Sequence, residues 1–136
     1  MKKLFTLLFL LAFWGCKSNE PDRLIVGEWV LREYVPVNWA GGGPKVTVTD
    51  NWWIEKFTRS GKYERIIRDT LRMSADYSVS ADGKKIEFGN GFWYEKGVKR
   101  KGIGSGISIY SLDRQLFTYS NLDSHSSVYT FHRKRN

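Results

Sequence analysis

The sequence has few of the side chains on which metal proteins and many enzymes depend. It contains one cysteine, two histidines and three prolines in 136 residues. A single cysteine excludes an intramolecular disulfide, and one cysteine with two histidines supplies too few ligands for a typical zinc site. The apolar run at residues 4–14 is shorter than the roughly 20 residues that a membrane-spanning helix needs. We therefore expect no metal, no cofactor and no transmembrane helix.

Catalytic side chains are scarce as well. His125 stands near Asp123 and is flanked by serines at positions 124, 126 and 127, so the residue types of a Ser/His/Asp catalytic triad are present. Catalytic triads are normally assembled from distant segments, whereas these residues are adjacent in one predicted turn. His132, the other histidine, lies in the next predicted strand. We predict that the protein is not an enzyme.

Positive charge exceeds negative charge. The formal net charge is +8, and it falls to +6 if Lys2 and Lys3 are removed with an N-terminal signal. Such a balance favours anionic lipid surfaces or acidic ligands, and no nucleic-acid-binding motif is present. The densest basic stretch comprises Lys96, Lys99, Arg100 and Lys101. It is either a solvated loop or a surface facing anionic lipid or polysaccharide.

The N-terminal residues have the pattern that is typical of an export signal peptide. Met1, Lys2 and Lys3 precede the apolar run, which ends at Gly15 and Cys16. This pattern resembles a bacterial lipoprotein signal, in which the cysteine receives the lipid, such as palmitate. It implies removal of residues 1–15, lipidation at Cys16, membrane attachment through that lipid, and an outer-membrane location in the cell envelope. The alternative is an ordinary signal peptide followed by an incidental cysteine.

The remaining chain has the size of one domain. Removing 15 of 136 residues leaves 121, which is enough for one hydrophobic core without disulfide or metal support. Residues 16–22 are polar and include a helix-discouraging proline, so we interpret them as a tether. The domain is predicted to span residues 23–136. Hydrophobic and aromatic fractions of 41% and 15% favour a packed globule over a disordered chain.

Short β-type runs separated by turn residues continue from there to the end of the chain, without helical periodicity. Glycines at residues 41–43 predict a long loop between the first two runs. The segment 96–106, rich in Lys, Arg and Gly, is expected to be irregular or an edge strand. The predicted strands are 28–37, 52–58, 62–69, 76–80, 84–88, 92–95, 107–112, 116–120 and 128–133.

Sequential hairpins without a crossover helix make an antiparallel sheet. Such a meander either remains open with two exposed edges or closes into a barrel, and closure removes the edges. We therefore predict an all-β fold, a small antiparallel up-and-down β-barrel of about eight strands. A barrel of that size is nearly filled by side chains or holds one small ligand.

Several motifs resemble the lipocalin-like domain of bacterial lipoproteins. Gly27-Glu28-Trp29 resembles the Gly-x-Trp motif that opens the first strand of lipocalins. Residues 57–63 match a Phe-x-x-x-Gly-x-Tyr hairpin, residues 82–84 form a later Asp-Gly-Lys turn, and residues 129–133 close the chain as Tyr-x-Phe-x-Arg. The resemblance implies that Arg133 packs over Trp29 at the closed end of the barrel, in a structural role.

The aromatic residues suggest a binding role. Most should fill the core, but Trp53, Phe57 and Trp93 are our candidates for lining a ligand pocket near the barrel mouth. We therefore expect non-catalytic binding of a small apolar or amphipathic molecule. Two alternatives remain open: an envelope adaptor that binds protein partners not identified by the sequence, and a carbohydrate-binding module using exposed Trp52 or Trp93.

Overall fold

The computed structural model describes residues 20–36, 43–102, 106–122 and 127–135. These residues form one short helix, α2 (Pro21–Leu24), and a sheet of ten strands. The strands are β1 (Gly27–Val35), β2 (Val46–Thr47), β3 (Trp53–Phe57), β4 (Lys62–Ile67), β5 (Thr70–Val79), β6 (Lys85–Glu95), β7 (Val98–Lys101), β8 (Ile107–Leu112), β9 (Leu116–Asn121) and β10 (Val128–Arg133).

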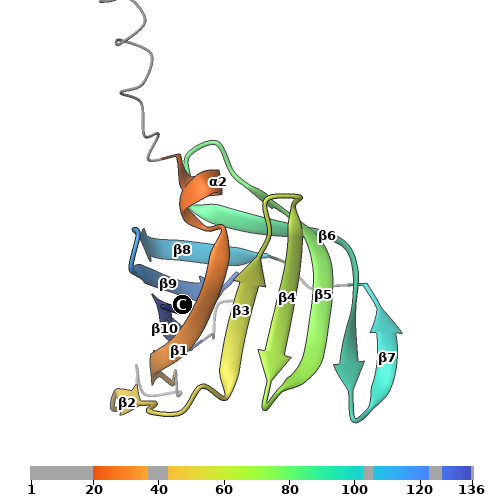
Figure 1. Cartoon of the computed structure of the whole chain (residues 1–136), viewed down its shortest axis with the longest axis horizontal. Coiled ribbons are helices and arrows are strands. Elements are labelled where there is room, and N and C mark those ends of the chain that lie inside the picture. Colours follow the sequence, from red (N-terminus) through yellow and green to blue (C-terminus); the bar gives the residue numbers. More distant parts are fainter. Residues whose placement is uncertain (1–19, 37–42, 103–105, 123–126, 136) are drawn as a thin grey trace, which may run out of the picture.

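The sheet closes on itself (Figure 1). Eight strands make the wall, in the order β1, β3, β4, β5, β6, β8, β9 and β10, and β10 pairs with β1. All pairings are antiparallel, while β2 and β7 pair with β1 and β6 outside the ring. The predicted small antiparallel barrel of about eight strands is confirmed. Closure satisfies the backbone groups that two edge strands would expose.

The turn between β4 and β5 differs from the prediction. The fourth strand ends at Ile67 because Arg68 and Asp69 adopt positive φ angles of 48° and 59°, which belong to a two-residue hairpin turn. The next strand then begins at Thr70 rather than at Asp76. This hairpin was not predicted, because an Arg-Asp pair lacks the glycine or asparagine that is typical of such turns.

The sixth strand is also longer than predicted. It runs without interruption through Gly89 and Gly91, where the sequence analysis placed a break between two strands. Near these glycines the pairing between β5 and β6 continues, with a shift in register between Ala75 and Tyr77. Beyond it, β6 turns at Lys96 and Gly97 into β7, which pairs with β6 alone. The expected edge segment is thus part of a long hairpin outside the wall.

The helix α2 begins at Pro21, within the stretch interpreted as a tether. Pro21 stands in the first turn of α2, where its missing N–H and fixed φ suit a helix start. The backbone N–H groups of Arg23 and Leu24 both donate to the carbonyl oxygen of Glu20, each over 3.0 Å. This single turn lies over one end of the barrel (Figure 1), which we call the α2 end; the opposite end is the far end.

The core follows from alternation along the wall strands. In β3, residues 53, 55 and 57 turn inward while Lys56 turns outward to pair with Glu64. Most inward positions carry aromatic or branched side chains. The buried core comprises Ile25, Trp29, Leu31, Val48, Phe57, Tyr63, Ala75, Ile86, Ile107, Phe117, Tyr119 and Phe131.

The seam between β6 and β8 is the shortest in the wall. It has two residue pairs, Lys85 with Ser108 and Ile86 with Ile107, whereas β1 and β3 share four. Gly106 lies against the opposing backbone, and a Cβ at this position would overlap the carbonyl oxygen of Ile86. A side chain at residue 106 would therefore force the two strands apart at the seam.

Candidate functional site

The α2 end is built around Trp29. Its side chain is fully buried, and its Nε1 donates to the carbonyl oxygen of Ile25 over 2.7 Å. Arg133 is its cross-strand partner on β10, and the guanidinium carbon lies 4.2 Å from the centroid of the indole. The contact between Trp29 and Arg133 implied by the motif is present, as a cation–π pair.

Gly27 makes room for this pair. A Cβ at residue 27 would overlap Nη1 of Arg133, and the φ angle of 144° also favours glycine. With that space open, Nη1 and Nη2 of Arg133 donate to the carbonyl oxygens of Val26 and Leu24, over 2.7 and 2.5 Å. The three motif residues therefore tie the last strand to the segment between α2 and β1.

A group of polar side chains lies inside the barrel beyond this end. Glu55 is 1% exposed although it carries a carboxylate, and its cross-strand partner on β4 is Arg65. Tyr63 comes from the same strand as Arg65, and Tyr119 comes from β9 across the interior. Together with Trp53, these residues form what we call the polar cluster.

The cluster is organised around the Glu55 carboxylate. Its Oε1 accepts hydrogen bonds from Trp53 Nε1 at 2.7 Å, Arg65 Nε at 2.9 Å and Tyr119 Oη at 2.9 Å. Its Oε2 accepts a hydrogen bond from Tyr63 Oη. Arg65 Nη2 also donates to Tyr119 Oη at 3.2 Å. A buried carboxylate is tolerable only with such partners, because an unpaired one loses its hydration without compensation.

Burial sets the protonation of the surrounding groups. It raises the pKa of Tyr63 and of Tyr119 well above that of a free tyrosine, and the Glu55 charge adds to the effect. Burial alone would lower the pKa of Arg65, but the Glu55 carboxylate opposes this and the pKa is raised overall. At neutral pH the two hydroxyls are therefore neutral donors and the guanidinium is charged.

Arg65 is the accessible member of the ion pair. Its side chain is 21% exposed, against 1% for the side chain of Glu55. The Trp53 ring lies beside it, with 5.1 Å from the guanidinium carbon to the ring centroid. Nε and Nη2 have acceptors, whereas Nη1 has none among the described residues. One charged nitrogen thus remains available next to an aromatic ring.

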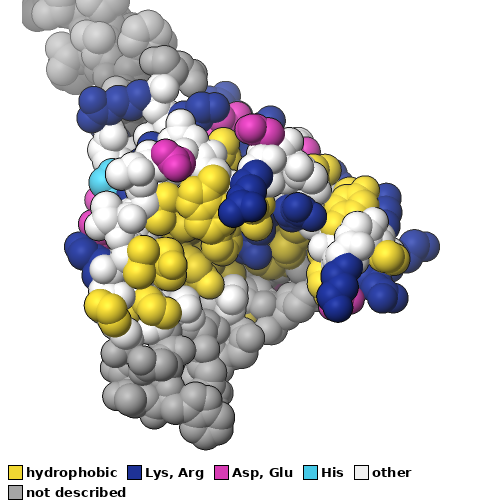
Figure 2. Space-filling view, turned by 90° about the horizontal axis from the view of Figure 1, so that it is seen from below, with side chains coloured by type: hydrophobic (Ala, Val, Ile, Leu, Met, Phe, Trp, Pro, Cys, Tyr) yellow, Lys and Arg dark blue, Asp and Glu magenta, His cyan; other side chains and the backbone are white. Residues whose placement is uncertain are grey.

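Aromatic rings continue from Trp53 to the far end of the barrel. Trp53 lies 5.0 Å from Tyr129 and 5.7 Å from Trp52, and Tyr129 lies 6.4 Å from Tyr34, all between ring centroids. These four side chains are only partly buried. Figure 2 looks onto this end and shows hydrophobic side chains gathered there beside Lys and Arg side chains. The far end therefore combines apolar surface with positive charge.

The structure separates the three predicted ligand-binding residues. Trp53 lies at the far end as part of the polar cluster. Phe57 lies in the packed core, 2% exposed, with its ring against Tyr63 and Phe117. Trp93 is 39% exposed on β6, with β4 and β5 between its strand and that of Trp53. Of the three, Trp53 lies next to the guanidinium of Arg65, whereas Phe57 is packed among other rings.

Some predicted features lie outside the described residues. They include the lipidation position Cys16, most of the glycine loop, and Asp123 with His125. His132 is exposed on β10. Within the ranges the structure describes, no three His, Cys, Asp or Glu side chains gather as a metal site would require. In the same ranges, no helix has the length and apolar character needed to cross a bilayer.

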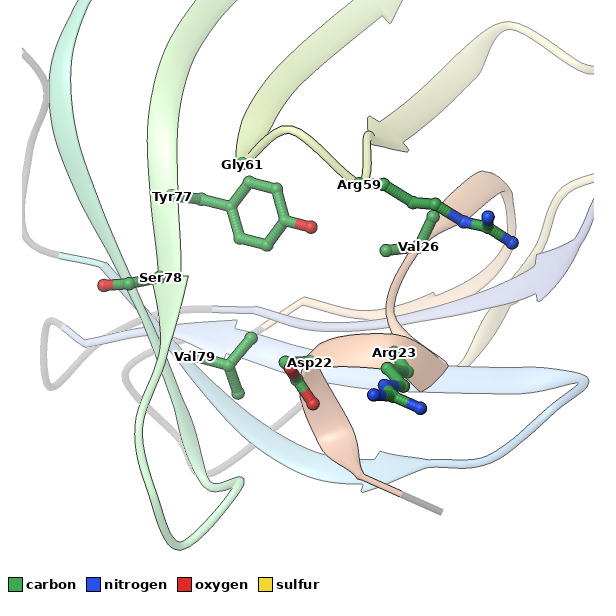
Figure 3. A pocket seen from close by; sticks show the side chains of 8 residues that line it. All are labelled: Asp22, Arg23, Val26, Arg59, Gly61, Tyr77, Ser78 and Val79. Carbon is green, nitrogen blue, oxygen red and sulfur yellow. The ribbon is translucent and has the colours of Figure 1, made fainter. Parts of the chain in front are cut away.

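A pocket at the α2 end lies between α2, the turn that joins β3 to β4, and β5. It has a volume of about 740 Å³ and is lined by Asp22, Arg23, Val26, Arg59, Gly61, Tyr77, Ser78 and Val79. Figure 3 shows the Tyr77 side chain pointing across it towards Arg59. The Tyr77 hydroxyl already donates to the carbonyl oxygen of Thr58 over 2.9 Å. None of the residues predicted as ligand contacts lines this pocket.

The basic stretch lies partly along a second surface groove, between β5 and the β6–β7 hairpin. Lys99 and Lys101 line it, with Phe92 and three glycines, and Lys99 Nζ lies 4.0 Å from the Phe92 ring centroid. Arg100 instead pairs with Glu95 over 3.5 Å. The stretch is thus an exposed edge strand with some local partners.

Glu55, Arg65 and Tyr119 are site residues that were not predicted from the sequence. The signal was present: alternation in 53–57 places residue 55 on the same face as Trp53 and Phe57, where a carboxylate is unusual. No pattern in the sequence pairs Tyr119 with a strand 64 residues earlier. That contact depends on closure of the barrel.

Comparison with known proteins does not assign the chain to a family. No known family matches the chain, and no curated protein is recognisably similar to it in sequence.

Proposed function

We propose that this protein binds a small amphipathic molecule at the far end of the barrel, without catalysing a reaction on it. The observation that carries the proposal is the position of Arg65. Its charged guanidinium is held at the inner wall by Glu55 and Tyr119, and it adjoins the partly buried Trp53 ring.

Small-molecule sites typically combine apolar walls with a few convergent polar groups. The far end has both components. Trp52, Trp53 and Tyr129 supply apolar surface, while the polar cluster supplies a fixed donor. The interior towards α2 is different, because Trp29, Phe57 and Phe117 pack there against one another. We therefore place the ligand between the polar cluster and the far end.

Native mass spectrometry of the protein purified from its own host tests this proposal. We expect a small molecule bound to the intact protein and released by denaturing extraction. It should be lost in Trp53→Ala and retained in a control, Tyr110→Ala, which removes a 64% exposed ring on β8. Protein without any bound small molecule, or equal loss from both variants, would contradict the proposal.

The adaptor and carbohydrate alternatives predict other outcomes. An adaptor needs a contiguous exposed apolar patch. The large exposed hydrophobic residues in the described ranges are spread over several elements: Trp93, Val98, Tyr110 and Leu122. A protein partner retained in the native spectra would favour an adaptor, and saccharide binding lost in Trp93→Ala would favour the carbohydrate alternative.

We further propose that the protein is attached to the cell envelope, at the outer membrane, by a lipid on Cys16. The support is the basic and apolar N-terminal pattern that ends at the only cysteine. The first described residue, Glu20, directly precedes α2, so few residues separate Cys16 from the barrel. An attached lipid would hold the α2 end towards the membrane and leave the far end facing away from it.

A further inference from the structure

The polar cluster restricts which polar group a ligand can bring. Glu55 already accepts hydrogen bonds from Trp53, Arg65, Tyr119 and Tyr63. A carboxylate offers about four acceptor positions, and this one is 1% exposed. Because the carboxylate is buried behind these four donors, an ammonium or hydroxyl group of a ligand cannot reach it. A ligand that needs an acceptor would find none at Glu55.

The other members offer no acceptor either. The Tyr119 hydroxyl donates to Glu55 and accepts from Arg65, and the Tyr63 hydroxyl is buried against Glu55. The Trp53 indole has only a donor, which it has already given. What remains is Nη1 of Arg65, a charged donor on a side chain that is 21% exposed. The cluster therefore selects for acceptors.

We infer that the ligand is a small carboxylic acid whose carboxylate binds Nη1 of Arg65 and whose apolar body packs beside Trp53 and Tyr129. This inference rests on the proposed function and adds the chemical class of the ligand. A carboxylate is favoured over a neutral acceptor at this guanidinium, because hydrogen bonds between ionised partners are stronger than those between neutral ones. The short distance from Trp53 to the guanidinium, 5.1 Å, places the apolar body directly next to the acid group.

Hydrogen bonds also fix the Arg65 side chain in position before a ligand binds. Two of its three guanidinium nitrogens, Nε and Nη2, are fixed by Glu55 and Tyr119, so Nη1 has a defined direction before the ligand arrives. A lysine would carry the same charge on a flexible stem and could not keep both fixed contacts and a third donor in a plane. The residue thus acts as a specificity determinant for acids over alcohols and amines.

Three probes of the same shape test the inference: 4-phenylbutanoate, 4-phenylbutanol and 4-phenylbutylamine. Each is titrated into the purified full-length chain near neutral pH, and binding is followed by calorimetry. We expect the acid to bind at least about tenfold more tightly than the alcohol, and the amine to bind most weakly. Equal binding of acid and alcohol would overturn the inference while leaving the proposed function intact. No binding by any probe, nor by dodecanoate, would contradict both.

The double variant Glu55→Gln/Arg65→Met provides a second test. It removes both charges together, so no unpaired carboxylate remains inside the barrel. We expect it to lose the preference for acid over alcohol while still binding the alcohol. The control is Arg114→Met, which removes one positive charge from an exposed turn at the α2 end and should keep the preference. An unchanged preference in the double variant would overturn the inference.

Discussion

Replacing Arg65 with methionine should destabilise the fold strongly, because it leaves the Glu55 carboxylate buried without its cation. Removing one partner of a buried ion pair typically costs about 3 to 5 kcal/mol. Here the lower part of that range applies, about 3 kcal/mol, because Arg65 itself is 21% exposed and three other donors still bind the carboxylate. Methionine keeps the length of the side chain, so the loss of packing is small.

A double-mutant cycle separates the ion pair from packing. Glu55→Gln alone should cost about 2 kcal/mol, because an amide NH₂ would then face the donors that now surround Glu55. The double variant should be less destabilised than the sum of the two single variants, by at least about 1 kcal/mol. Urea unfolding followed by tryptophan fluorescence and far-UV circular dichroism gives each free energy.

Additivity would refute this reasoning. If the two single effects sum to the double effect within about 0.5 kcal/mol, the two side chains do not interact in solution. Arg114→Met is the matched control, since it removes an exposed arginine and should change the free energy of unfolding by no more than about 0.5 kcal/mol. A comparable loss in that control would mean that net charge, and not the buried pair, determines the result.

Other parts of the structure make further predictions. Trp29→Ala should lower the free energy of unfolding by about 3 to 5 kcal/mol, because it empties the α2 end; an unchanged melting temperature would contradict the assigned role. Gly106→Ala should cost about 1 to 3 kcal/mol by pushing the β6–β8 seam apart, which chemical denaturation would measure; a neutral effect would be incompatible with the seam. Burial raises the pKa of Tyr63 and Tyr119, so the unfolded chain releases these protons at lower pH than the folded protein does. Stability should be retained below about pH 10 and fall above it, less steeply in Tyr63→Phe/Tyr119→Phe, and equal slopes would argue against the buried hydroxyls. Detergent-phase partitioning should decrease in Cys16→Ala if a lipid is attached there, and equal partitioning of both proteins would exclude that anchor.

Local patterns predicted the architecture well because strands and glycine-containing turns carry direct sequence signals. The strands at 107–112 and 128–133 were predicted with the bounds that the structure has. The hairpin at Arg68 and Asp69 was missed because arginine rarely adopts a positive φ angle, and the tolerance of aspartate for this conformation is too weak a signal by itself to mark the turn. The strand prediction therefore failed in two ways: it missed a turn without glycine at Arg68 and Asp69, and it placed a break at Gly89 and Gly91 inside the continuous strand β6.

The candidate site was predicted only in part. Trp53 was selected as an aromatic residue on a strand, and the structure places it beside Arg65. Phe57 was selected by the same argument, yet it lies two inward positions further along β3, in the packed core. Aromatic character alone does not distinguish the two ends of a barrel. How far along the barrel axis a residue lies depends on the register of its strand, which the residue type does not indicate.

The polar cluster depends on long-range closure. Glu55 and Arg65 are neighbours in one hairpin, so their pairing was accessible from register. Tyr119 approaches them only because β10 pairs with β1 and brings β9 round the interior. No short-range pattern encodes that contact, and for this reason only aromatic residues were predicted as ligand contacts.

The most direct test of ligand binding at the far end is the response of the tryptophan indole N–H signals in a ¹H–¹⁵N NMR spectrum during titration with 4-phenylbutanoate. The account predicts that the Trp53 Nε1–H and Arg65 Nε–H signals shift together and saturably, because both groups bond Glu55 beside the proposed site. The Trp29 signal should stay in place, since its N–H is buried against Ile25 at the α2 end. A saturable shift of Trp29 or Trp93 with Trp53 and Arg65 unchanged would contradict the account.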